Sequence, residues 1–494
     1  MTPFSSRIFV AVALICVLVS AGPTSAQLPL PFDQASIKSL RDSKRKVFAH
    51  YFTQFPRSLD NHDPASDYYA KGYIDPAGEG GKWLKVGGFL RQRPVPRAPM
   101  ADKGWPDRDM ETEVKLAAAL GIDGFTVDLL GAPTMKNYHW SRTMQLARAA
   151  AKIDPGFKII PMPDMTAGYA HNKEALTTAI TELAALPSIY KLADGRVVVS
   201  PYCAQTDPPE WWAEWIAEMK AKGIDIAFLP LFQNWRAYVE KYKDVSIGAS
   251  DWGLRTVGAN AKWFGDAAQF AHKSVPIWMA PVSFQDYRPK DTFGFEASNS
   301  ANYRTMWMNA IDGGADWVQL ITWNDYSECT EITPSTGTQW SVYDLTAYYT
   351  AWFKTGKMPK IKRDVLYYFH RVESTEAPYD ADKQVRKTSL ATGSDPFVNE
   401  IELLAFLTKP GKIEIEVGGH TQSLDAKAGM TSMRVPLAPG TPHFRLIRGG
   451  KAEIDFASAF EIVASAPYQD FLYRGGSNTR PPVDYAQQAP VAAK

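Results

Sequence analysis

Two carboxyl residues that follow a short apolar stretch are the strongest chemical signal in this sequence. Residues 317–322 (WVQLIT) are almost entirely apolar, and Asp325 and Glu328 come soon after them. Burying a carboxylate costs free energy unless it is paired or hydrogen-bonded, so two acids at the end of a buried strand indicate a place where charge is used. One carboxylic acid can protonate a departing oxygen while a second carboxylate activates water or attacks carbon, which is the chemistry of glycosidic cleavage.

Aromatic and amide side chains accompany the two acids. Trp323, Asn324 and Tyr326 stand between the strand and Glu328. Aromatic rings stack on the apolar C–H faces of sugars, whereas amides and carboxylates hydrogen-bond to sugar hydroxyls. The stretch therefore predicts a carbohydrate site in which Asp325 and Glu328 are catalytic and the other three residues bind substrate.

The chain before this stretch alternates between expected strands and expected helices. The strands are expected at residues 47–52, 124–130, 157–163, 196–202, 226–232, 245–249, 275–282 and 317–322. Helical connections imply parallel strands, and eight such repeats predict an α/β fold of the (β/α)8 TIM-barrel type. A doubly wound open sheet is the alternative, but no Gly-x-Gly-x-x-Gly follows an early strand.

The carboxyl ends of the strands carry the active site in a parallel barrel. Further polar and aromatic residues stand at or just after several expected strands, and we predict that they bind substrate: His50, Tyr51, Asp128, Asp164, Gln233, Asn234, Trp235, Asp251 and Trp252. Asp128 or Asp164 could instead cap a helix or accept a structural hydrogen bond. His50 could be a satisfied polar group below the barrel mouth.

The motif TWNDYSE at residues 322–328 resembles the TWNDYGES signature of glycoside hydrolase family 71, the endo-α-1,3-glucanases or mutanases. Weaker similarities lie at residues 46–52 (KVFAHYF), 110–129 (METEVKLAAALGIDGFTVDL) and 244–252 (DVSIGASDW). Together they cover most of the expected barrel, and in this family a β-sandwich follows the barrel.

The resemblance implies an inverting hydrolase of α-1,3-glucosidic bonds whose catalytic carboxylates are Asp325 and Glu328. Inversion requires the two carboxyl groups to lie about 6.5–9.5 Å apart, with room for a water molecule. We expect Glu328 to be the general acid and Asp325 the general base. Asp128 and Asp251 would then bind sugar hydroxyls, or one of them would be the base instead.

Residues 329–331 (CTE) depart from the usual family pattern, which bears on the subsites beside the cleaved bond. A family 99-like hydrolase acting on α-mannan is an alternative, although its motif has Glu–Trp where this chain has Asp325 and Tyr326. A non-catalytic glycan-binding barrel is a hypothesis of another class and would bind α-glucan without releasing reducing ends. A purely structural barrel is a third hypothesis.

The composition argues against several kinds of partner. The chain has 54 Lys and Arg against 53 Asp and Glu, so it has no basic excess for nucleic acid or anionic lipid. It contains no CxxC, HExxH or His-rich tract, and we expect neither a metal nor a cofactor. The expected partner is a polysaccharide or oligosaccharide, and the oligomeric state is open. Cys203 and Cys329 could form a disulfide or stay as buried thiols.

The N-terminus predicts a cleaved signal peptide at residues 1–26. Arg7 precedes a short apolar run at residues 8–19, and small residues follow at 24–26. A membrane anchor is the alternative, but a span needs about 20 apolar residues and this run is shorter. We therefore expect a secreted or periplasmic protein without a stable membrane anchor.

The length of 494 residues predicts more than one domain. We assign residues 27–360 to the catalytic barrel. Residues 361–474 contain short alternating runs separated by turns, which predict an antiparallel β-sandwich domain whose aromatic residues serve packing. The polar residues 475–494 predict a disordered tail.

Overall fold

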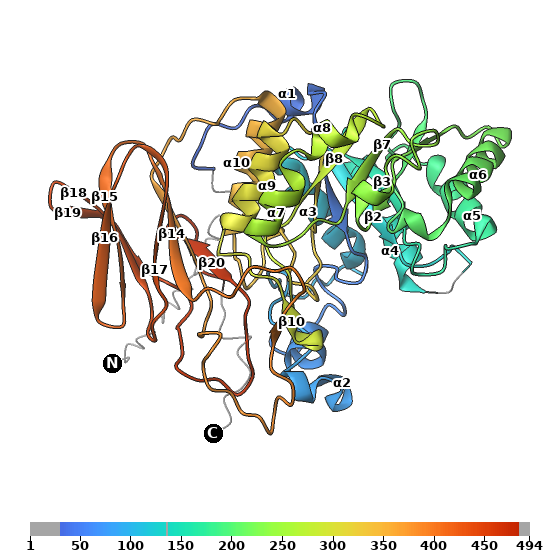
Figure 1. Ribbon diagram of the computed structural model, residues 1–494. Coiled ribbons are helices and arrows are strands. Elements are labelled where there is room, and N and C mark those ends of the chain that lie inside the picture. Colours follow the sequence, from blue (N-terminus) through green and yellow to red (C-terminus); the bar gives the residue numbers. More distant parts are fainter. Residues whose placement is uncertain (1–29, 135–136, 484–494) are drawn as a thin grey trace, which may run out of the picture.

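A computed structural model describes residues 30–134 and 137–483 as a parallel α/β part followed by an antiparallel β part (Figure 1). The expected signal peptide at residues 1–26 and the end of the expected tail at residues 484–494 lie outside the described residues. No helix in the described ranges has the length and apolar character needed to cross a membrane.

A curled parallel sheet forms the centre of the first part. Its seven strands follow the spatial order β3-β2-β1-β11-β8-β7-β6. Residue Ala49 in the first strand lies opposite Leu320 on one side and Phe125 on the other, so the first and last strands of the repeat are neighbours. The strands are β1 (Lys46–Tyr51), β2 (Gly124–Leu129), β3 (Lys158–Pro163), β6 (Leu231–Phe232), β7 (Gly248–Asp251), β8 (Ile277–Val282) and β11 (Trp317–Leu320).

Two further strands, β4 (Val197–Val199) and β5 (Ile226–Phe228), form a separate parallel pair. Backbone hydrogen bonds connect this pair to the large sheet on both sides: Ser200 N donates to Pro161 O (3.0 Å) and Ile247 N donates to Phe228 O (2.8 Å). Because proline has no N–H, residues such as Pro161 interrupt a regular ladder here. The expected α/β class and parallel sheet are confirmed, whereas closure into a complete barrel stays a prediction.

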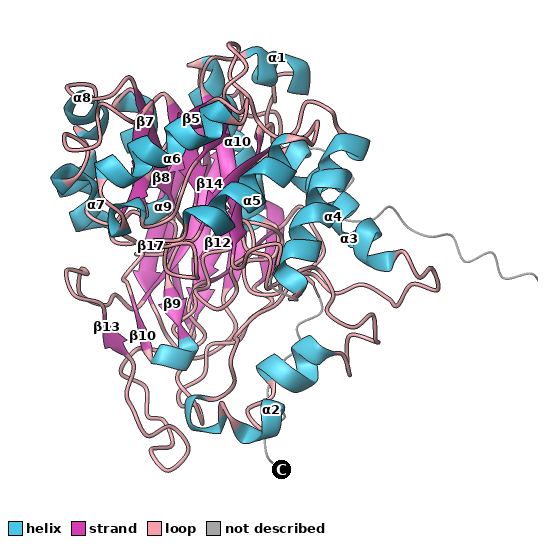
Figure 2. Cartoon of the chain, turned by 90° about the vertical axis from the view of Figure 1, so that its right-hand side faces the viewer, coloured by secondary structure: helices cyan, strands magenta, loops and turns pink. Residues whose placement is uncertain are grey.

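Helices cover the outside of the sheet, as seen in Figure 2. Side chains alternate along β1: Val47 and Ala49 belong to the large core shared with the helices, whereas Phe48 packs inside the curl against Met279 and Trp317. The helices are α1 (Ile37–Asp42), α3 (Trp105–Ala119), α4 (Tyr138–Ile153), α5 (Lys173–Ala184), α6 (Pro209–Ala221), α7 (Val257–Phe264), α8 (Ala267–Ala271), α9 (Ala301–Asp312) and α10 (Ser341–Thr355).

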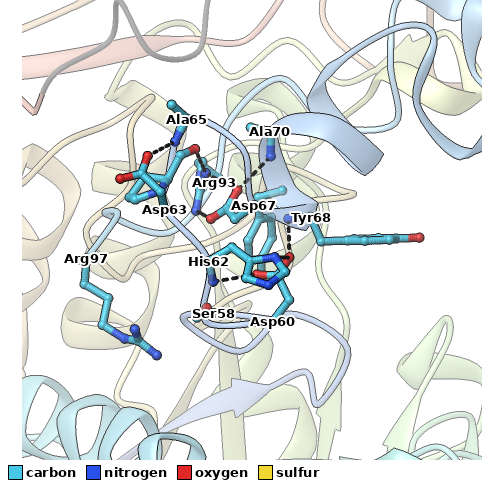
Figure 3. A network of polar contacts seen from close by, with 12 residues as sticks. Ser58, Asp60, His62, Asp63, Ala65, Asp67, Tyr68, Ala70, Arg93 and Arg97 are labelled. Carbon is cyan, nitrogen blue, oxygen red and sulfur yellow. Dashed lines mark hydrogen bonds and ion pairs between the residues drawn. The ribbon is translucent and has the colours of Figure 1, made fainter. Parts of the chain in front are cut away.

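The long segment after β1 is ordered by buried charge. It contains the short helices η2 (Tyr69–Ile74), α2 (Gly78–Gly81) and η3 (Leu84–Val86). Arg93 and Asp67 form an ion pair in which both side chains are almost fully buried, and Figure 3 shows them facing each other below the start of η2. Arg97 donates to both oxygens of Asp109 at 2.7 Å, which ties the segment to α3.

The second part consists of two four-stranded antiparallel sheets, with the orders β17-β14-β12-β20 and β16-β15-β18-β19. Leu366 and Tyr368 lie in the core between the two sheets, whereas Tyr367 and Phe369 pack on the other face against the α/β part. The strands are β12 (Val365–His370), β14 (Glu400–Leu407), β15 (Gly411–Val417), β16 (His420–Ala426), β17 (Gly429–Pro436), β18 (His443–Arg448), β19 (Lys451–Ala457) and β20 (Arg474–Ser477).

The two parts meet along α10, which Figure 1 shows beside the first antiparallel sheet. The rings of Tyr348 and Phe406 are 4.9 Å apart across this boundary. The structure differs from the expected tail boundary, because residues Arg474–Ser477 form β20 and pair with β12.

A small sheet of three strands lies at the carboxyl end of the parallel strands, low in the view of Figure 2. Strand β9 (Tyr287–Arg288) pairs antiparallel with β10 (Phe293–Gly294), and β10 pairs parallel with β13 (Ser389–Leu390). The third strand thus comes from the chain beyond β12 and joins a hairpin that follows β8.

Candidate active site

The floor of the candidate site is a layer of polar and sulfur-containing side chains inside the curl. His50 projects from β1 on the same face as Phe48, and its Nδ1 lies 3.1 Å from Met162 Sδ. Gln319 of β11 donates from Nε2 to Thr126 Oγ1 at 3.3 Å. Burial lowers the pKa of His50 to about 3, so its imidazole is neutral at ordinary pH.

Four carboxyl groups from three strand ends gather above this floor. Asp128, at the end of β2, is buried and has Asp164, Asp325 and Glu328 as charged neighbours. Burial first, and then these three neighbours, raise the pKa of Asp128 well above its usual range. Its Oδ1 is buried without a hydrogen-bond partner among the described residues, so this acid has unused hydrogen-bonding capacity.

Asp325 is held by the turn that follows β11. Its Oδ1 accepts hydrogen bonds from Ser327 N (2.9 Å), Ser327 Oγ (2.8 Å) and Glu328 N (3.1 Å). Burial raises the pKa of Asp325, and these three donors oppose that rise because they stabilise the charged form. The turn therefore fixes the orientation of this carboxylate.

Glu328 has a different environment within the same turn. Its Oε1 lies 3.0 Å from Arg288 Nη1, whereas its Oε2 is buried and has no hydrogen-bond partner in the described chain. Burial, followed by the nearby Asp286 and Asp325, raises the pKa of Glu328 to about 8, against the opposing effect of Arg288. Glu328 therefore holds a proton at neutral pH. Its side chain is 18 % exposed.

Three charged residues beside Glu328 were not anticipated from the sequence. Asp286 and Arg288 come from the β9 hairpin, and Arg255 follows β7. Arg255 is 2 % exposed, and its Nη2 has no hydrogen-bond partner among the described residues. A signal for the first two was present, since Asp-Tyr-Arg at residues 286–288 comes soon after the expected strand at 275–282.

An aromatic and polar rim adjoins the acids. The Trp252 ring makes edge contacts at 5.0 Å with both His50 and Tyr202. Gln233 is exposed and donates from Nε2 to Tyr202 Oη at 3.0 Å, and its neighbour Asn234 is also exposed. Tyr202, which sequence reasoning missed, therefore connects the predicted Trp252 with the predicted Gln233.

Asp164 and Asp251 make local backbone contacts at their strand ends. Asp164 accepts from the backbone and hydroxyl of Thr166, both at 2.7 Å. Asp251 accepts from Trp235 N (3.0 Å) and Gly253 N (2.7 Å). These bonds shape the loops above the strands. For Asp164, accepting a structural hydrogen bond is the alternative that the sequence left open.

Several predicted substrate-binding rings lie away from the acids. Tyr51 and Trp323 belong to the core behind the sheet: Tyr51 Oη donates to Met110 Sδ, and Trp323 Nε1 donates to Glu113. Trp235 packs 4.2 Å from the Trp278 ring, and Tyr326 is enclosed in an aromatic cluster of the segment after β1.

Asn324 also makes structural contacts. Its Oδ1 accepts from Phe52 N (2.8 Å), and its Nδ2 donates to Phe52 O (2.9 Å) and Phe55 O (2.8 Å). These bonds clamp the turn of Asp325 to the chain leaving β1.

The structure gives Cys203 and Cys329 as buried free thiols. Across the described ranges, no group of three or more His, Cys, Asp or Glu side chains is arranged to hold a metal ion.

Comparison with known proteins identifies relatives of this chain. The model of glycosyl hydrolase family 71 matches residues 101–473. The chain is 23% identical over 387 residues to glucan endo-1,3-alpha-glucosidase agn1 of Schizosaccharomyces pombe, covering 73% of this chain and 88% of the relative. It is 22% identical over 409 residues to a mutanase of Penicillium rubens, covering 76% and 88%.

A solved structure also resembles the fold. The GH99 endo-alpha-mannosidase from Bacteroides thetaiotaomicron matches 63% of this chain and 98% of its own, with 16% sequence identity and a TM-score of 0.48.

Proposed function

The chain belongs to glycosyl hydrolase family 71 and is a glycoside hydrolase, and from this premise we propose that it cleaves α-1,3-glucosidic bonds of an α-glucan with inversion of the anomeric centre. The linkage follows the names of the two relatives and the signature at residues 322–328. We also propose that the protein is secreted, on the basis of its predicted signal peptide, and that β4 and β5 complete a closed barrel.

The contrast between the two acids of one turn carries the catalytic assignment. Three donors surround Asp325 Oδ1, which favours a carboxylate able to accept a proton from water. Glu328 has one carboxyl oxygen without a hydrogen-bond partner among the described residues. Its pKa of about 8 favours an acid able to give a proton. We therefore assign Asp325 as the general base and Glu328 as the general acid.

The reaction then proceeds in one displacement. Glu328 protonates the glycosidic oxygen as the C–O bond breaks, and Asp325 removes a proton from a water molecule that attacks the anomeric carbon from the opposite face. The product is a hemiacetal of inverted configuration, and the departing sugar leaves as an alcohol. The proton taken by Asp325 returns to solvent, and Glu328 regains one from solvent.

Asp128 and the rim residues are proposed to bind the sugar. The pKa of Asp128 is raised well above the usual range by burial, which favours the neutral carboxyl, and a neutral carboxyl can donate to a sugar oxygen. Trp252 offers a ring face, and Gln233 and Asn234 offer exposed amides.

The test is incubation of the purified protein with insoluble α-1,3-glucan, α-1,4-glucan and α-mannan. We expect new reducing ends from α-1,3-glucan alone, and NMR of the first product should show the β-anomer. An α-anomer formed first would contradict inversion, and binding without new reducing ends would favour the non-catalytic alternative.

A further inference from the structure

A chain of ionic contacts lies beside Glu328. Arg288 donates from Nε and Nη2 to the two carboxyl oxygens of Asp286, at 2.9 and 3.0 Å. Its remaining nitrogen, Nη1, lies 3.0 Å from Glu328 Oε1. Asp286 is 1 % exposed and Arg288 is partly exposed, and the two parallel hydrogen bonds fix the orientation of the guanidinium.

The main chain fixes the same arrangement. Tyr287, which separates Asp286 from Arg288, donates from its backbone N to Glu328 O at 2.9 Å. Phe295 N donates to Asp286 O at 2.9 Å, which closes the β9–β10 hairpin. Glu328 is therefore held through its carbonyl and through one carboxyl oxygen by the same short segment.

This arrangement leaves a single oxygen of Glu328 for chemistry. Oε1 is occupied by Arg288, whereas Oε2 is buried and has no partner among the described residues. We propose that Asp286 and Arg288 are positioning residues that hold Glu328 so that Oε2 meets the departing sugar oxygen. The inference rests on the proposed function, in which Glu328 is the general acid.

The opposite charges of the two residues give the proposal a distinctive readout. Asp286 raises the pKa of Glu328 and Arg288 lowers it. The other groups that face Glu328 stay unchanged in the test. The titratable and charged groups around Glu328 are Asp128, Tyr202, Arg255, Asp286, Arg288 and Asp325.

The experiment compares the full-length wild type with Asp286→Asn, Arg288→Gln and Arg288→Lys on α-1,3-glucan oligosaccharides. Asp286→Asn should move the alkaline limb of the kcat profile to lower pH by about one pH unit, and Arg288→Gln should move it to higher pH. Arg288→Gln should also lower kcat by about 10- to 100-fold with little change in KM, because Glu328 is no longer held toward the departing sugar oxygen. Lysine should restore part of kcat, since it keeps one cationic donor.

Arg386 supplies a matched control. It donates to Thr292 Oγ1 and to the carbonyl of Asp291, so it braces the same hairpin without touching Glu328. Arg386→Gln should leave the pH profile in place. If Arg386→Gln and Arg288→Gln give the same loss of kcat and the same unmoved profile, Arg288 only supports the hairpin and the proposal is wrong.

Glu328→Gln, measured in parallel, separates this inference from the proposed function. If Glu328→Gln is nearly inactive while the Asp286 and Arg288 variants keep the wild-type pH profile, the positioning role alone fails. If Glu328→Gln keeps the wild-type rate, the assignment of the general acid fails, and the positioning role falls with it.

Discussion

The indole of Trp323 donates a hydrogen bond of 2.6 Å from Nε1 to Oε2 of Glu113 on α3. Both side chains are buried behind the sheet, although Trp323 is separated by one residue from Asp325, the proposed general base. This bond anchors the start of the turn that carries Asp325 and Glu328 to the helical layer, so Trp323 supports the turn from behind.

The pair predicts a pH-dependent stability. Burial raises the pKa of Glu113 from 4.5 to about 7, so the folded state holds a proton that the unfolded state releases above pH 4.5. Stability is therefore lost as the pH rises from 4.5 to 7, by up to about 3 kcal/mol from this group. Glu113→Gln should show a smaller fall in Tm between pH 5 and pH 8 than the wild type, measured by differential scanning fluorimetry. An equal fall in both proteins would contradict the raised pKa.

Asp325→Asn and Glu328→Gln should each lower kcat on α-1,3-glucan by about 100- to 10,000-fold, because each removes one half of the acid–base pair. Their Tm values should stay close to that of the wild type. Glu416→Gln in the antiparallel part is the matched control and should keep full activity. Wild-type rates in both variants would show that the catalytic carboxyl groups lie elsewhere.

A substrate whose leaving group needs no proton should distinguish the acid from the base. In an α-1,3-glucan oligosaccharide that carries an α-fluoride at its reducing end, the fluoride ion departs without protonation. Glu328→Gln should therefore retain much of the wild-type rate on this substrate. Asp325→Asn should stay slow, because the attacking water still needs a base. The rates are measured as fluoride release. A slow Glu328→Gln and a fast Asp325→Asn would make Asp325 the general acid and Glu328 the general base.

The rate of the wild type should fall as the pH rises through about 8, where Glu328 loses its proton. The profile of kcat/KM against pH checks this expectation. With the fluoride substrate the same limb should flatten, since the proton on Glu328 is no longer required. A limb that persists unchanged on the fluoride would belong to another group.

Asp128 should tolerate a neutral amide better than a small apolar side chain. Burial raises its pKa and so favours the neutral carboxyl, and asparagine is neutral and of nearly the same shape. We expect Asp128→Asn to keep kcat/KM within about 10-fold, and Asp128→Ala to lose about 100-fold because the sugar loses its donor. A larger loss for asparagine than for alanine would indicate that a charged carboxylate is needed.

The buried pair of Asp67 and Arg93 should control the order of the segment after β1. Asp67→Asn leaves the Arg93 guanidinium buried without a countercharge, at a cost of about 3–5 kcal/mol. We expect faster proteolysis between residues 53 and 104, detected by mass spectrometry of limited digests. Asp63→Asn, in the same loop but exposed, is the control (Figure 3).

Much of the scaffold could be predicted because it depends on local patterns. Strand–helix alternation predicted the parallel class, and the structure places Phe48 and His50 on one face of β1, as the alternation of side chains along a strand requires. The same rule explains why Tyr51 lies elsewhere: neighbouring residues of a strand point to opposite faces. His50 and Tyr51 both stand at the end of the expected strand, so their positions in the sequence did not distinguish them. The directions of their side chains do.

The rest of the site depends on contacts between distant segments. Arg288 reaches Glu328 because a hairpin after β8 folds back over the end of β11. Neither the direction of that hairpin nor the bidentate bond to Asp286 is encoded in a periodic pattern. Tyr202 likewise becomes part of the rim only through its contacts with Trp252 and Gln233.

The parallel pairing of β10 with β13 makes the sequence beyond residue 360 a structural part of the catalytic unit. A protein truncated at that residue would lose Ser389 and Leu390, and the strand that carries Arg288 would belong to an unsupported hairpin. The antiparallel region therefore cannot be exchanged like an appended accessory module, and expression trials of a minimal enzyme should retain it.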